Sequence, residues 1–99
     1  MIEGDSVRII KACSLRIEEY RVGRGSWGID TTRIDLPVGT LLKYDGGRTP
    51  KGQQWGQVCF FTYTDSEGEE HTGRLPERDI FAGAPPVSDE SYYEVKKND

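Results

Sequence analysis

The segment from Trp55 to Thr64 constrains the fold more than any other part of the sequence. In a β-strand, successive side chains point to opposite faces of the sheet. Here both faces receive large apolar groups, with Phe60 on one and Phe61 and Tyr63 on the other. A strand that has to bury both of its faces belongs in the middle of a sheet. The segment therefore predicts a β-fold in which it is a central strand.

The rest of the chain also has sequence patterns that are typical of β-strands, although they are weaker. Short runs of Val, Ile, Leu, Phe and Tyr are separated by twelve glycines and five prolines, and no stretch has a sustained helical period of apolar residues. This pattern predicts an all-β domain. Further strands are expected from about Ser6, over Leu15–Val22, over Ile29–Ile34, over Thr40–Tyr44, over Glu70–Arg74, and as a last short strand near Phe81.

Glycine, proline and polar residues predict where the chain turns. The three glycines between Gly23 and Gly28 indicate a hairpin tip. Turns or loops are also expected at Leu36–Gly39, at Asp45–Gly47, over the solvated stretch Arg48–Gln54, and at Asp65–Glu69.

Length and composition predict one domain and a tail. A chain of 99 residues encloses a single compact core. After Gly83 the sequence becomes proline-rich and acidic, with few apolar residues to offset the entropy of ordering. We expect a folded domain over residues 1–83 and an acidic flexible tail over residues 84–99 that lies outside the packed fold.

Charge and cysteine content narrow the classes of function. The net charge of −4 disfavours general nucleic-acid binding, which depends on clustered Lys and Arg. The sequence has no apolar run of membrane-spanning length, and Met1–Ser14 lacks the pattern of a signal peptide. Cys13 and Cys59 have no CxxC spacing and are too few for a disulfide framework. A cytoplasmic protein is expected, and whether the two thiols lie close together stays open.

Two motifs in the second half of the chain resemble those of SH3 domains. Leu36–Tyr44 is similar to the segment in which a glycine and a polar residue lead into an apolar strand, and Trp55 opens the next strand. Gly73–Ile80 is similar to the family's ending, in which Gly, an apolar residue and Pro precede a last short strand. The resemblance implies an SH3-like small barrel of five to six short antiparallel strands, with a long first loop and a flexible C-terminal tail.

The same resemblance does not extend to the family's groove for proline-rich peptides. The family's tyrosines near the first strand and after the late proline correspond here to Ile10–Cys13 and Asp79. Of the aromatic platform, only Trp55 and Pro76 carry over, and Tyr20 is a candidate substitute from the first loop. The resemblance therefore implies the scaffold, and fold alone does not fix function.

Two further groups of residues are candidate contact sites. Trp27 lies among glycines at the expected hairpin tip, where it is either an exposed contact anchor or a cap folded back over one end of the barrel. The first long loop and the Arg48–Gln54 loop form a positive patch around Tyr20 and Trp27 if the two loops adjoin. Such a patch can bind single-stranded nucleic acid or a phosphorylated partner. Its cationic residues are Arg16, Arg21, Arg24, Arg33, Arg48 and Lys51. The alternative is an ordinary solvated surface, neutralised by Glu18, Glu19, Asp30 and Asp35.

The sequence predicts no catalytic, metal or cofactor site. His71 is the only histidine, and Asp65 and Ser66 lie close to it in sequence without any nucleophile motif. The histidine and the scattered carboxylates lack the spacing of metal ligands.

We therefore interpret the chain as a non-enzymatic interaction module that binds a protein segment or ligand through loops at one end of the barrel. Two alternatives stay open. One is a small oligomeric enzyme with a pocket shared between subunits, and the other is a regulator from a mobile element that binds or mimics nucleic acid. The oligomeric state is not predicted. The candidate binding residues are Tyr20, Trp27, Trp55, Pro76, Arg24 and Arg48.

Overall fold

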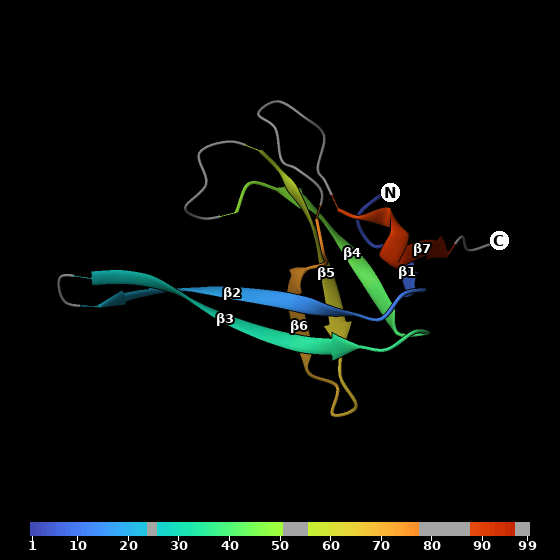
Figure 1. The fold of residues 1–99 in the computed structure, drawn as a ribbon, viewed down its shortest axis with the longest axis horizontal. Helices are drawn as coiled ribbons and strands as arrows, with labels where there is room; N and C mark the ends of the chain where they lie inside the picture. The colour runs from blue at the N-terminus through green and yellow to red at the C-terminus, as the bar shows by residue number, and fades with distance from the viewer. Residues whose placement is uncertain (24–25, 51–55, 78–87, 97–99) are drawn as a thin grey trace.

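A computed structural model shows an all-β protein built on one antiparallel sheet of seven strands (Figure 1). It describes residues 1–23, 26–50, 56–77 and 88–96. The elements in chain order are β1 (Ser6–Ile9), β2 (Cys13–Gly23), β3 (Ser26–Leu36), β4 (Leu41–Arg48), β5 (Val58–Thr64), β6 (Glu70–Arg74), a single turn of 3₁₀ helix η1 (Glu90–Tyr92), and β7 (Tyr93–Lys96). Within these ranges, no helix is long and apolar enough to cross a membrane.

The order of strands across the sheet is β3-β2-β6-β5-β4-β1-β7, so β5 lies in the middle. This confirms the central position predicted for its segment. Phe61 and Cys59 are buried on one face, whereas Phe60 lies partly exposed on the other. The hydrophobic core forms around Phe61, and its other buried members are Val7, Ile9, Leu15, Leu36, Leu42, Tyr44, Cys59, Leu75 and Tyr93.

The β2–β3 hairpin extends from the body of the molecule as a long arm (Figure 1). Its ladder runs from Cys13 opposite Leu36 to Gly23 opposite Ser26, so the reversal expected at the glycines is confirmed. The long first loop implied by the resemblance is instead part of these two eleven-residue strands. Alternating apolar residues and cross-strand pairing stabilise an extended conformation that a loop would lack.

The turn expected at Leu36–Gly39 is also present. The backbone N–H of Thr40 donates to the carbonyl of Pro37 at 3.2 Å. Gly39 adopts a φ of +97°, a conformation in which a side chain would be strained. This turn joins β3 to β4.

The β4 strand is longer than the sequence pattern indicated. Asp45–Gly47 was expected to end it, but pairing with β5 resumes at Gly47 opposite Cys59 after a register shift. The glycine-rich segment therefore forms a β-bulge inside the strand, which local composition does not distinguish from a turn. The bulge carries β4 on to Arg48.

The C-terminal segment differs from the expected tail. Tyr93–Lys96 form β7, which pairs with β1, and the ring of Tyr93 packs at 5.2 Å from the ring of Phe61. The hydroxyl of Tyr93 also shares a 2.5 Å hydrogen bond with Ser88. One buried aromatic ring and a backbone ladder order this segment, in which the other residues of β7 are exposed. The domain boundary expected at residue 83 falls outside the described residues.

Candidate functional site

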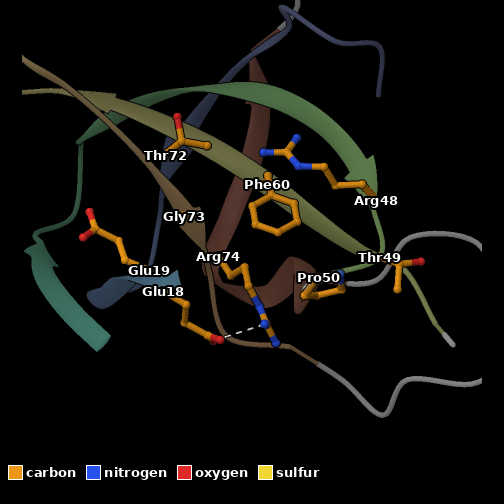
Figure 2. A pocket seen from close by; sticks show the side chains of 9 residues that line it. All are labelled: Glu18, Glu19, Arg48, Thr49, Pro50, Phe60, Thr72, Gly73 and Arg74. Atoms are coloured by element: carbon orange, nitrogen blue, oxygen red, sulfur yellow. Dashed lines mark hydrogen bonds and ion pairs between the residues drawn. The ribbon is translucent and has the colours of Figure 1, made fainter. Parts of the chain in front are cut away.

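The outer face of the sheet is hollowed around Phe60 into a groove of about 680 Å³ (Figure 2). We call it the face groove. Its floor is the ring of Phe60, and buried Pro50 adds a second apolar surface. Its lining includes Glu18, Glu19, Arg48, Pro50, Phe60 and Arg74.

Arg48 covers one side of the aromatic floor. Its guanidinium carbon lies 4.0 Å from the centroid of the Phe60 ring, a cation–π arrangement worth roughly 0.5–1 kcal/mol at an exposed site. Asp45 holds the guanidinium in place with a carboxylate oxygen 3.3 Å away. Because the β-bulge extends β4 to Arg48, this side chain reaches the groove from the end of a strand.

Glu18 and Glu19 line the other side of the groove and come from β2. Arg48 therefore stands on one side of the Phe60 ring, and the Glu18 and Glu19 carboxylates stand on the other together with Arg74, which pairs with Glu18 (Figure 2). An amphipathic ligand with an apolar group between polar groups matches this arrangement.

Four charged residues form a closed ring of ion pairs beside the groove. Arg74 is buried and binds both carboxylate oxygens of Glu77, at 2.5 and 2.9 Å, and its Nη1 donates to Glu18 at 3.1 Å. Arg16 contacts the same two carboxylates, at 3.0 Å for Glu18 and 3.3 Å for Glu77. A bidentate pair of this kind is rigid, so Arg74 forms a fixed wall of the groove.

Gly73 allows this ring to form. A Cβ atom at this position would lie 2.4 Å from the backbone oxygen of Arg16. The glycine therefore lets β6 approach β2 closely enough to bring Arg74 directly opposite Arg16.

A second groove, of about 530 Å³, adjoins the first at Arg74, which lines both. We call it the arginine groove. The lining residues used below are Ser14, Arg16, Arg33, Arg74, Pro76 and Tyr92.

A third cluster lies at the β5–β6 turn. One carboxylate oxygen of Asp65 accepts hydrogen bonds from the backbone N–H groups of Glu67 and Glu69, both at 2.9 Å, and the other lies 2.9 Å from Nε2 of His71. These bonds, led by the one with His71, lower the pKa of Asp65. Asp65, Glu69 and His71 also place potential metal-ligand atoms within 4.8 Å of one another. The hydrogen bonds that close the turn account for the cluster.

The structure distributes the candidate residues over several places. Arg48 lies in the face groove and Pro76 in the adjoining arginine groove. Tyr20 pairs with Ile29 and Trp27 with Val22 in the ladder of the hairpin arm. Arg24 and Trp55 lie outside the described residues.

Arg48 and Pro76, which line the grooves, were candidates from the sequence, but Phe60, Pro50 and Arg74 were not. Phe60 was assigned to a buried strand face, Pro50 to a solvated loop without apolar residues, and Arg74 to an ordinary strand end. Their roles depend on cross-strand register, above all on Arg74 opposite both Arg16 and Phe60. The one local signal was the alternation that separates Phe60 from Phe61.

Comparisons of the chain with models of protein families, with curated proteins and with solved structures found no match.

Proposed function

We propose that the protein is a non-enzymatic interaction module that binds an extended segment of a partner protein in the face groove. The observation that carries this proposal is the partly exposed ring of Phe60, which forms the floor of a groove between Arg48 and the carboxylates of β2. Aromatic and arginine side chains at the centre of a contact surface are the residues that contribute most to protein binding.

The shape and the charge of the groove define the ligand that it fits. An apolar side chain of the segment rests on Phe60 and Pro50. A carboxylate of the segment faces Arg48, and a cation faces Glu19. The charge of −4 on the whole chain disfavours a polyanion.

We also propose that the scaffold which carries the groove is an SH3-like barrel. Its support is the resemblance of Leu36–Tyr44 and Gly73–Ile80 to the family's motifs, together with the all-β architecture. Seven strands rather than five or six form the sheet, and β3 and β7 are not paired with each other within the described residues. Two free cysteines fit a reducing compartment such as the cytoplasm.

A peptide-display selection on the immobilised full chain tests the proposal. We expect enriched peptides with an apolar residue flanked by residues of opposite charge. Fluorescence anisotropy with a selected peptide should give an affinity that falls about tenfold or more in Phe60→Ala, which removes the floor of the groove. Thermal unfolding of the variant verifies that it is folded.

A matched pair of arginine variants separates the groove from general electrostatics. Arg48→Gln removes a charge from the groove, whereas Arg8→Gln makes the same change at an exposed site where Arg8 pairs with Glu94. We expect Arg48→Gln to weaken binding about threefold to tenfold and Arg8→Gln to change it less than twofold. Equal losses in the two variants, or no peptide enriched, would contradict the proposal.

A further inference from the structure

Three arginines lie in one row across three strands of the sheet. Arg16 on β2 is directly opposite Arg33 on β3 and Arg74 on β6. Residues directly opposite each other in antiparallel strands project from the same face. All three line the arginine groove. Like charges placed in this way repel each other, so the row needs anionic partners.

Within the described residues, carboxylate partners pair with Arg74 and Arg16 but not with Arg33. Nε, Nη1 and Nη2 of Arg74 all donate to Glu18 or Glu77. Arg33 is exposed and has no ion-pair partner within the described part of the chain. The row is therefore neutralised at Arg74 and left positive at Arg33.

Arg16 has donor capacity that its neighbours do not use. Its Nη2 donates to Glu77 at 3.3 Å, and its Nε, enclosed from solvent, lies 3.0 Å from Glu18 without the alignment of a hydrogen bond. A guanidinium has five N–H donors. An additional acceptor in the groove would use the remaining donors, and Arg33 would bind the same acceptor from the neighbouring strand.

The charges around the arginine groove sum to a small positive excess. Lys11 adds a cation, with its Nζ atom 4.8 Å from the ring centroid of Tyr92 at the rim. Asp35 adds a carboxylate, which accepts a 3.3 Å hydrogen bond from Ser14. Among the described residues around the groove, four cations thus face three carboxylates, the other two carboxylates being those of Glu18 and Glu77. The total charge of the protein is −4.

We infer that the arginine groove binds a single oxyanion, the phosphate or carboxylate group of a side chain in a protein segment. Arg16 and Arg33 are its donors, and Arg74, fixed by Glu18 and Glu77, keeps Arg16 in place. The three nearby carboxylates oppose a nucleic-acid strand, which would bring several phosphates to this surface. The inference rests on the proposed function in one respect, because the segment that carries the oxyanion is the segment bound in the face groove. The two grooves adjoin at Arg74.

The test uses the full chain and small anions, so it needs no peptide. Inorganic phosphate, O-phosphoserine and acetate are titrated at pH 6 and constant ionic strength, and NMR follows the side-chain Nε–Hε signals of the arginines. We expect saturable shifts at Arg16 and Arg33 and none at Arg8. Arg33→Gln should weaken phosphate binding about tenfold, and the matched Arg8→Gln should change it less than twofold.

The probes distinguish the two sources of the oxyanion. Tighter binding of O-phosphoserine than of acetate assigns the groove to a phosphorylated side chain, whereas equal binding assigns it to an acidic one. Shifts that are not saturable, or an Arg33→Gln variant that binds phosphate as well as the wild type, overturn the inference. Tighter binding of a ten-nucleotide single-stranded DNA than of O-phosphoserine also overturns the inference, if Arg33→Gln and Arg8→Gln weaken the binding of the DNA equally.

The outcome of the anion titration does not depend on the outcome of the peptide selection. Anion binding without any selected peptide means that the face groove has been misassigned and the arginine groove has not. A selected peptide that depends on Phe60, together with no anion binding, leaves the proposed function intact and removes this inference.

Discussion

At the scale of single residues, Arg74 is the most completely buried charged residue among those that the structure describes. It is 8% exposed, and its charge is balanced by Glu77 and Glu18. Burying two charges costs desolvation free energy, which the bidentate geometry offsets. Removing one partner leaves the other charge buried without compensation.

We therefore expect Glu77→Gln to lower the free energy of unfolding by about 2 to 4 kcal/mol, measured by urea denaturation. Glu67→Gln makes the same change on an exposed turn residue and should cost less than about 0.5 kcal/mol. Similar values for the two variants would mean that the ring of ion pairs contributes nothing to stability.

Tyr44 gives a prediction at alkaline pH. Burial, followed by the neighbouring Cys59, raises the pKa of Tyr44 to about 12 from an ordinary value of 10.0. The neutral phenol is thus favoured in the folded state, and its stabilising contribution is complete below pH 10 and lost as the pH rises towards 12. Tyr44→Phe should retain more of its neutral-pH stability at pH 11 than the wild type does, measured by urea denaturation at both pH values. Parallel losses in the two proteins would contradict the assigned pKa.

At the scale of elements, β7 contradicts the prediction, made from composition, that the C-terminal segment is a flexible tail. A four-residue strand with one buried ring is enough to order a polar segment when a neighbouring strand offers a free edge. Deleting residues 84–99 should therefore cost about 3 kcal/mol or more, because the deletion removes the Tyr93 ring from the core and the ladder from β1. Thermal unfolding measures this loss. Removing residues 97–99 alone deletes none of these contacts, and an equal effect of the two truncations would show that β7 is not stabilising.

The β5–β6 turn is a second element whose stability depends on one side chain. The hydrogen bond with His71, and those from the turn N–H groups, lower the pKa of Asp65 below its ordinary 3.8. Its folded pKa is thus depressed, so the stabilising contribution of the carboxylate is present above pH 3.8 and is lost as the pH falls below that value. Asp65→Asn should be less stable than the wild type at pH 7, and the difference should shrink below pH 3.8. A difference that is constant with pH would exclude the carboxylate as its source.

At the scale of the whole molecule, the rates at which the two thiols are chemically modified measure how readily the sheet opens. Cys59 is buried on the central strand, whereas Cys13 is half-buried at the wall of the arginine groove, and burial raises its thiol pKa. Modification of Cys59 requires the sheet to separate, but modification of Cys13 requires only local exposure. Ellman's reagent at pH 8 should therefore modify Cys13 at least about ten times faster than Cys59. Cys13→Ser and Cys59→Ser assign the two rates, and equal rates would contradict the burial of Cys59.

The structure buries Cys59 and leaves Cys13 half-buried. Both contribute to one core, Cys59 as a buried member and Cys13 packed against it. Residue type does not distinguish the two positions, because burial depends on which strands cover each one.

Local sequence patterns predicted the strands β1 to β6, the hairpins at Gly23–Gly28 and Asp65–Glu69, and the central place of β5. They did not predict β7, and the last short strand expected near Phe81 lies outside the described residues. The features that they predicted follow from local periodicity and turn chemistry, which act between residues close together in the chain. Only the tertiary structure decided that Asp45–Gly47 is a bulge, that Tyr93 joins the core, and that Arg16, Arg33 and Arg74 share a row. Those features depend on which strands become neighbours and in what register, since a shift of one residue turns every side chain to the opposite face.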